Sequence, residues 1–294
     1  MESPGIIAFV VLHYGDAKVT YRCVDSILKL QGQEWVRIVV VDNDASKEST
    51  ERKKQWESYE ENKRVHTILI WERMGFSKAN NIGYQYAKRH FDPECIIAAN
   101  NDLIFEQSDF LVRMRESLQK NPCEILSPDI IGDPSGTHQS PIAQKARSDM
   151  QVRFTILLNR LCLILLPIIA PLLSWYDRRA RNRKPEQEKD ERREKQEGIV
   201  PCGACLIIAS RFLSREEKLF EPETEFYYEE FILHSRCQAK GYRIRYDPDL
   251  PVLHGDSVAT RKRASSERER LAFVMKNTLE SAKIYQQYRK TLQS

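Results

Sequence analysis

Four short apolar runs in the first hundred residues have the composition of strands that are buried on both faces. The runs lie at residues 6–12, 36–41, 65–70 and 95–99. They are rich in Val and Ile, and the stretch between the first two, residues 16–30, carries apolar side chains at helical spacing. Strands that alternate with helices in this way predict an α/β fold with right-handed crossovers and a mostly parallel sheet flanked by helices.

Polar side chains follow two of these runs directly. Asp42 and Asn43 come after the second run, and Asn100, Asn101 and Asp102 come after the fourth. Ligands of open α/β sheets bind in the crevice outside the carboxyl ends of the strands, where a carboxylate can hold a cation against a phosphate. These side chains are therefore candidates for a ligand site, although Asn and Asp also end strands simply by forming Asx turns.

The segment at residues 74–87 (MGFSKANNIGYQYA) combines a loop with the start of a helix. Gly75 offers a loop backbone that can approach a ligand closely, and Ser77 is the expected N-cap of the helix. Asn80 and Asn81 fall within that helix, where propensity alone disfavours Asn. We interpret the two Asn residues as carrying a polar function, with solvated surface positions as the alternative.

The second half of the chain contains further strand and helix patterns. Strand patterns lie at residues 125–127, 202–209, 242–246 and 251–253. Helix patterns lie at residues 107–120, in the second part of 220–237 and at 265–292. The last of these is a long amphipathic helix, for which the core, a second subunit and a membrane are all candidate partners.

Residues 147–198 form an insert outside the expected sheet. Within it, residues 154–173 are strongly apolar but include two Pro, an Asn and an Arg, so they are not a clean run of about twenty apolar residues. Aromatic and basic residues follow them: Trp175, Tyr176, Arg178, Arg179, Arg181, Arg183 and Lys184. This composition is typical of a segment lying in an anionic membrane surface, so we expect such contact through residues 154–184. A hairpin buried against the enzyme or a second subunit, and a spanning helix, are the alternatives.

The composition is that of a soluble protein from a reducing compartment. Of the 294 residues, 30% are charged, and the acids and bases interleave to a net charge of only +4, so no nucleic-acid partner is indicated. Seven cysteines at irregular spacing do not form a disulfide framework, and we interpret the Cys202 and Cys205 pair as structural. The first residues run directly into a strand without a basic region or cleavage site, so we expect no secretion signal.

Seven segments of the chain, taken in order, resemble a known enzyme family. They are VVLHY (10–14), VVVDNDAS (39–46), RMGFSKANNIGYQYA (73–87), AANND (98–102), PCGACLII (201–208), FYYEEFILHSRCQAKGYRIRYDP (226–248) and VLHGDS (252–257). Together they resemble the inverting family 2 glycosyltransferases of the GT-A fold, especially the rhamnosyltransferase-like branch. The resemblance covers most of residues 6–257 and implies a GT-A fold that carries a helical insert and a C-terminal helix.

The resemblance implies roles in holding a nucleotide-sugar donor. The donor-binding candidates are Leu12, His13, Tyr14, Asp42, Asn43, Gly75, Phe76, Asn81, Asn100, Asn101 and Ser257. Asp42 and Asn43 would bind a pyrimidine edge, with the backbone of residues 12–14 beside the base. His13 departs from the Asn that the family usually has at its position.

A divalent cation, Mg²⁺ or Mn²⁺, is the cofactor that the resemblance implies. A cation that is bound to both phosphates stabilises the negative charge that develops on the leaving diphosphate. Asp102 matches the second acid of the family's Asp-X-Asp motif, whereas Asn100 replaces the first acid and contributes no charge. His254 matches a family histidine near the metal and the diphosphate.

Glu230 is the expected catalytic base, with Glu229 beside it in acceptor binding. The pair lies where the family has Glu-Asp, so the base here is one methylene longer. A single displacement needs one carboxylate on the face opposite the leaving group, and inversion follows from that geometry. Two adjacent, partly buried acids raise each other's pKa, whereas in the alternative both would be solvated residues in the first turn of a helix.

The sequence thus predicts four regions and one principal function. The regions are a nucleotide-sugar-binding half (1–146), the insert (147–198), an acceptor and catalytic half (199–260) and a C-terminal amphipathic helix (261–294). The expected protein is an inverting glycosyltransferase of bacterial surface glycan synthesis. It uses dTDP-rhamnose or a UDP-sugar and a lipid-linked or polysaccharide acceptor. We expect a cytoplasmic enzyme, peripheral at the inner face of the plasma membrane, and a homodimer is an open possibility. A catalytically silent nucleotide-sugar or glycan-binding partner, and a membrane-docking scaffold, are the competing interpretations.

Overall fold

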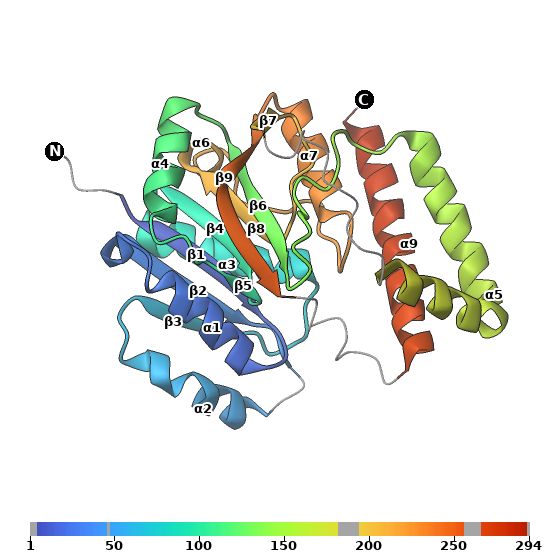
Figure 1. Ribbon diagram of the computed structural model, residues 1–294, viewed down its shortest axis with the longest axis horizontal. Coiled ribbons are helices and arrows are strands. Elements are labelled where there is room, and N and C mark those ends of the chain that lie inside the picture. The colour runs from blue at the N-terminus through green and yellow to red at the C-terminus, as the bar shows by residue number, and fades with distance from the viewer. Residues whose placement is uncertain (1–4, 46–47, 182–193, 256–265, 293–294) are drawn as a thin grey trace.

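A nine-stranded sheet with helices on both faces forms the centre of the described chain (Figure 1). The computed structural model describes residues 5–45, 48–181, 194–255 and 266–292. The strands are β1 (Ile7–His13), β2 (Val36–Asp42), β3 (Val65–Leu69), β4 (Cys95–Asn100), β5 (Leu103–Ile104), β6 (Ile125–Asp133), β7 (Gln196–Glu197), β8 (Cys205–Ala209) and β9 (Ile244–Gly255). The helices are α1 (Ala17–Ile27), η1 (Gln33–Trp35), α2 (Ser49–Glu60), α3 (Phe76–Phe91), α4 (Phe110–Lys120), α5 (Asp149–Arg181), α6 (Ser210–Leu213), α7 (Glu229–Ala239) and α9 (Glu267–Thr291).

The first four strands form the parallel part of the sheet, in the order β3-β2-β1-β4. This agrees with the βα alternation that the four apolar runs predict. In the second part, β8 runs antiparallel to both β4 and β6, and β9 runs parallel to β6. The sheet as a whole is therefore mixed, and strands of residues 1–146 pair with strands of residues 199–255 at β4–β8, β5–β9, β6–β8 and β6–β9.

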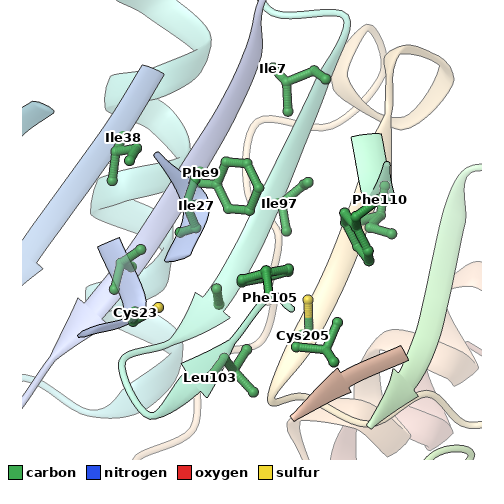
Figure 2. Close-up of a cluster of buried hydrophobic side chains, with 14 of the residues drawn as sticks. Ile7, Phe9, Cys23, Ile27, Ile38, Ile97, Leu103, Phe105, Phe110 and Cys205 are labelled. Atoms are coloured by element: carbon green, nitrogen blue, oxygen red, sulfur yellow. The ribbon is translucent and has the colours of Figure 1, made fainter. Parts of the chain in front are cut away.

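Each face of the sheet has its own hydrophobic cluster, because successive side chains of a strand point to opposite faces. Phe9 of β1 packs in the cluster formed with α1, α2 and α4, whereas its neighbour Val10 packs in the cluster formed with α3, α6 and α7. Figure 2 shows the first cluster, where Phe9, Ile97 and Phe105 lie close together. The rings of Phe9 and Phe105 meet edge to face, with 5.4 Å between their centroids.

The strand β9 is longer than the sequence pattern indicates. Residues 242–246 and 251–253 predict separate short strands, but β9 is continuous from Ile244 to Gly255. It passes through the turn-forming residues 247–249 because its pairing with β6 shifts register between Pro128 and Asp129. As a result β9 reaches the edge of the sheet where the polar strand ends gather, and it places His254 there.

The start of α3 differs from the expectation. The N-cap is Gly75, in extended conformation, whereas Ser77 lies inside the first turn. The Ser77 hydroxyl forms a hydrogen bond of 3.0 Å with the Thr224 hydroxyl. The backbone N–H groups of Phe76 and Ser77 donate to the carbonyls of Glu225 and Thr224. The first turn of α3 is therefore capped by a distant loop, so the prediction of Ser77 as N-cap is wrong.

The insert forms one long helix, α5, that packs against α9. Figure 1 shows the two helices side by side at one end of the molecule, with α5 changing direction along its length. Pro167 and Pro171 lie inside α5 and remove backbone N–H donors, which bends a helix. Leu166 and Ala170 of α5 contact Leu271 of α9. The C-terminal helix therefore packs against the insert, a partner that the sequence did not identify.

Candidate active site

The carboxyl ends of β1, β2 and β4 bring the predicted polar residues to one edge of the sheet. In the strand register His13 lies beside Asp42, and Leu12 lies beside Asn100. Leu12, Tyr14 and Asn100 are partly exposed, whereas His13 and Asp42 are fully buried. The strand-end pattern therefore placed these residues together, as expected for parallel strands.

Asp42 is the most extensively bonded side chain of this edge. Arg52 of α2 contacts both of its carboxylate oxygens, at 3.0 and 3.2 Å. The indole N–H of Trp56 donates at 2.9 Å, and the backbone N–H of Asp44 donates at 3.0 Å. Each carboxylate oxygen of Asp42 therefore accepts two contacts from other residues of the protein. Neither Arg52 nor Trp56 was a sequence candidate, because nothing in the pattern of α2 singles them out. The pyrimidine-binding role of Asp42 stays a prediction.

His13 and Asn101 share one hydroxyl partner in the buried layer behind the edge. The Thr20 hydroxyl lies 2.7 Å from His13 Nδ1 and accepts a hydrogen bond of 2.9 Å from the Asn101 side-chain amide. The same amide lies 3.4 Å from the carbonyl oxygen of Tyr14. These contacts fix the loop after β1, where the base of a donor is expected to lie.

Three further donor-binding candidates hold protein loops in place. Asn43 makes reciprocal hydrogen bonds with the backbone of Met74, at 2.7 and 2.9 Å. The amide of Asn81 donates to the Phe220 carbonyl at 2.8 Å, and its oxygen accepts from the Phe220 N–H at 3.0 Å. A Cβ at Gly75 would lie 2.6 Å from the Cα of Glu225, so only Gly fits there. Here Gly75 makes room for protein backbone, whereas the sequence suggested a ligand.

Asp102 and His254 meet across the β5–β9 pairing and form the candidate cation site. His254 lies opposite Leu103, and the Asp102 carbonyl accepts from the Gly255 N–H at 2.9 Å. Asp102 Oδ1 lies 3.2 Å from His254 Nε2, yet this buried oxygen has no hydrogen-bond partner among the described residues. The two groups are close without being aligned for a hydrogen bond.

This arrangement fits a divalent cation. Two neighbouring corners of an octahedron with bonds of about 2.1 Å lie about 3 Å apart, which is close to the observed separation. A carboxylate oxygen and an imidazole nitrogen suit Mn²⁺ as well as Mg²⁺ with retained waters. The described residues contain no group of three or more His, Cys, Asp or Glu side chains that could hold a metal, so Asp102 and His254 are the two ligand candidates among them. Ser257, the predicted phosphate donor, lies outside the described residues.

The two acids of the predicted base pair open α7. They follow Tyr227 and Tyr228, both with φ of 70°, a left-handed conformation that aromatic residues rarely adopt. Such strain costs about 1–3 kcal/mol per residue and persists where the surrounding structure fixes it. Here it turns the chain so that Glu229 and Glu230 both lie on the wall of one pocket.

The environment of the acid pair favours their protonated forms. Burial, and next the neighbouring Glu230, raise the pKa of Glu229 to about 8. Burial also raises the pKa of Glu230, and hydrogen bonds from the backbone N–H groups of Glu230 and Gly203 partly offset this rise. Glu229 Oε1 is buried and has no hydrogen-bond partner among the described residues. A weakly acidic carboxyl with one unpartnered oxygen on a pocket wall is typical of a site that handles protons.

The acid pair shares a pocket of about 420 Å³ with residues from several elements. The other lining residues are Phe76, Asn100, Ile142, Arg147, Gly203, Ala204, Phe226, Tyr227, Tyr228, Phe231 and Thr278. The Arg147 guanidinium lies over the rings of Tyr228 and Phe231, at 5.5 and 5.1 Å. Arg147 and Thr278 were not candidates, because the loop before α5 and the polar side of α9 carry no local signal. The pocket can hold an acceptor between an acid pair and aromatic walls.

Comparisons with known proteins agree with this architecture. The family model described as glycosyl transferase family 2 matches residues 8–183, more than half of the chain. No curated protein matches the sequence. The crystal structure of GalNAc-T7 with UDP, GalNAc and Mn²⁺ has a similar fold, with a TM-score of 0.54 and 15% sequence identity. The match covers 94% of this chain and 48% of that one, so this chain spans about half the length of the solved structure.

These findings confirm the α/β class and the GT-A fold that the sequence predicted. The rhamnosyltransferase-like branch and the roles of individual residues stay predictions. The family match runs from β1 to the end of α5 and includes the strand edge with Asp42, Asn100 and Asp102. The chain belongs to glycosyl transferase family 2.

Proposed function

We propose that this enzyme transfers a sugar, with inversion, from a pyrimidine-nucleotide diphosphate to a hydroxyl of a lipid-linked or polysaccharide acceptor in bacterial surface glycan synthesis. The observation that carries the proposal is the pair Glu229 and Glu230, with raised pKa values, on the wall of a pocket that also contains Asn100. Asn100 ends β4, two residues before the Asp102 of the cation site. The pocket therefore connects the base with the donor edge.

In the proposed reaction Glu230 takes the proton of the acceptor hydroxyl. The hydroxyl oxygen forms a bond to the anomeric carbon as the bond from that carbon to the diphosphate oxygen breaks. Because the attack comes from the face opposite the leaving group, the configuration inverts. Glu229, which keeps its proton near neutral pH, can donate a hydrogen bond to the acceptor. A cation bound by Asp102 and His254 would neutralise charge on the leaving diphosphate.

The donor is proposed to be dTDP-rhamnose or a UDP-sugar. GalNAc-T7, which has a similar fold, was solved with UDP and Mn²⁺, and this supports a nucleotide diphosphate donor and a divalent cation here. A thermal-shift comparison of nucleotide sugars with and without Mn²⁺ identifies the donor, because a ligand that binds the folded state raises its apparent stability.

The Glu230→Gln variant tests the base. We expect transfer to fall about 10²- to 10⁴-fold, since general-base catalysis contributes that much, while nucleotide binding stays at the wild-type level. Glu225→Gln, an exposed acid in the preceding loop, is the matched control and should transfer normally. Unchanged turnover in the Glu230 variant would contradict the assignment. A wild-type enzyme that binds donor but never turns over would favour a silent nucleotide-sugar-binding protein.

We further propose that the enzyme works in the cytoplasm at the inner face of the plasma membrane, docked through α5. Among the side chains of α5 that the structure describes, ten large apolar ones are exposed: Met150, Phe154, Leu157, Leu158, Leu161, Ile164, Leu165, Ile168, Leu172 and Trp175. Between residues 150 and 176 the sequence has two arginines and no acid, so an anionic lipid surface is the complementary partner. A second copy of the chain on this face is the competing partner.

The helix is proposed to lie in the surface of the bilayer. By length and composition alone, Asp149–Leu173 could span it, since an 18-residue window within it has a mean hydropathy of 2.3. However, α9 packs along α5 and carries the exposed Lys276 and Glu280 and the partly exposed Lys283. A spanning α5 would draw these charges into hydrocarbon, which is costly.

A further inference from the structure

We propose that Gln139 is a positioning residue for the cation site: its side-chain carbonyl holds the His254 ring so that Nε2 is the metal-binding nitrogen. The inference rests on the proposed use of a cation by Asp102 and His254. It adds a residue that lies 115 positions before His254 in the sequence, in a loop that carries no motif of its own.

The contact between Gln139 and His254 fixes the ring. His254 Nδ1 lies 2.7 Å from Gln139 Oε1. An amide oxygen can only accept a hydrogen bond, so Nδ1 carries the proton. In the neutral ring the lone pair then sits on Nε2, the nitrogen that lies 3.2 Å from Asp102 Oδ1. With the ring neutral, two acceptors thus face each other, and a cation between them would bind both.

A metal-binding histidine commonly donates its other ring N–H to an oxygen, which orients the ring and increases its basicity as a ligand. The amide of Gln139 supplies such an oxygen here. The buried Asp102 Oδ1, which has no hydrogen-bond partner in the described chain, is the independent sign that the other side of the ring faces a ligand position.

The loop that carries Gln139 is itself held on β6. The Gln139 backbone N–H donates to the Ile130 carbonyl at 2.7 Å. On either side of it, His138 contacts Asp129 at 2.7 Å, and the hydroxyls of Ser140 and Ser127 lie 2.8 Å apart. These contacts fix the backbone of the loop, so the amide reaches His254 from a rigid support. Rigid support is what a positioning residue needs.

The pair Gln139→Met and Gln139→Glu tests the role. Met keeps the side-chain length but loses the carbonyl, whereas Glu keeps an oxygen acceptor for Nδ1–H. We measure Mn²⁺ binding by electron paramagnetic resonance in the presence of UDP, and UDP binding without metal as a separate readout. Gln139→Met should bind Mn²⁺ about 10- to 100-fold more weakly, and Gln139→Glu should remain within about threefold of wild type. Metal-free UDP binding should not change in either variant.

The tautomer of His254 gives a second readout. It should change in Gln139→Met only if Gln139 orients the ring, and not if Gln139 merely stabilises the fold. In the metal-free wild-type enzyme, nitrogen NMR should show the proton on Nδ1, and in Gln139→Met the proton should redistribute to Nε2. Wild-type Mn²⁺ affinity in Gln139→Met, or a wild-type ring protonated on Nε2, would overturn the inference. If wild-type enzyme binds UDP but no Mn²⁺, the proposed cation use itself fails, and the inference fails with it.

Discussion

Glu230 occupies its position because residue 203 has no side chain. A Cβ at Gly203 would lie 2.5 Å from Glu230 Oε1 and 3.1 Å from its Cδ. The family resemblance places Asp at this position, so the longer Glu of this chain needs the space that Gly203 leaves. The position of the Glu230 carboxylate therefore depends on Gly203, which lies 27 positions earlier in the sequence.

Gly203→Ala should lower kcat about tenfold or more while the donor KM changes little, because the new methyl group displaces the carboxylate and leaves the donor edge intact. The double variant Gly203→Ala with Glu230→Asp is the control, since Asp is one methylene shorter and relieves the clash. Steady-state kinetics of the two single variants and the double variant form a mutant cycle. If the double variant recovers nothing over Gly203→Ala, steric coupling between the two positions is wrong.

Glu229 makes the stability of the protein depend on pH. Its pKa rises from 4.5 to about 8 on folding, so between these values the folded state holds a proton that the unfolded state has lost. Stability is then full below about pH 4.5 and falls as pH rises toward 8. Glu229→Gln removes this loss and should raise the free energy of unfolding at pH 8 by on the order of 4 kcal/mol. Urea unfolding at pH 5 and pH 8 checks this, and an equal effect of the variant at both pH values would contradict it.

Single residues show where sequence reasoning stops. The strand-end rule located Asp42, Asn100 and Asp102 because it depends only on where buried runs end. It could not show that Arg52 and Trp56 saturate Asp42, since these contacts depend on how α2 lies against the sheet. Side chains placed by periodicity are predictable, whereas partners brought in from other elements are not.

At the scale of elements, the strongly periodic segments were predicted well. Residues 16–30 predict a helix, and α1 begins after Asp16, whose carboxylate accepts from the Lys18 N–H at 3.0 Å. Residues 265–292 predict another, and α9 spans Glu267–Thr291. These two predictions succeed because the apolar stripe of a helix and its capping residue can be recognised from the local sequence.

Elements whose ends depend on a neighbour were predicted less well. Residues 247–249 contain turn formers and predict a break in the strand. However, β9 continues through them, because its register against β6 shifts at this point. The first turn of α3 is capped by the carbonyls of residues 224 and 225, which no local pattern indicates. The packing of α9 on α5 was likewise open, because an amphipathic stripe shows that a helix has a partner but does not name it.

In the whole molecule, α5, with its apolar face, packs against the elements that carry the acid pair. Val152 near the start of α5 packs with Phe231 of α7 and Tyr285 of α9. Arg147, two residues before α5, lines the pocket of Glu229 and Glu230. A membrane-bound α5 would therefore hold the pocket close to the bilayer, where a lipid-linked acceptor presents its sugar.

Vesicle binding tests this arrangement. The wild-type protein should sediment with vesicles of phosphatidylcholine and phosphatidylglycerol and bind more weakly to phosphatidylcholine alone, because cations next to the apolar face favour anionic lipid. Ile164→Glu with Ile168→Glu, at positions 73% and 78% exposed, should weaken binding about tenfold or more without lowering transfer to a soluble acceptor analogue. Val112→Glu on α4, 38% exposed, is the matched control and should bind as wild type does. Lipid binding that survives the double variant contradicts docking through α5. A lipid-free dimer that the same substitutions dissociate would instead assign this face to a second copy of the chain.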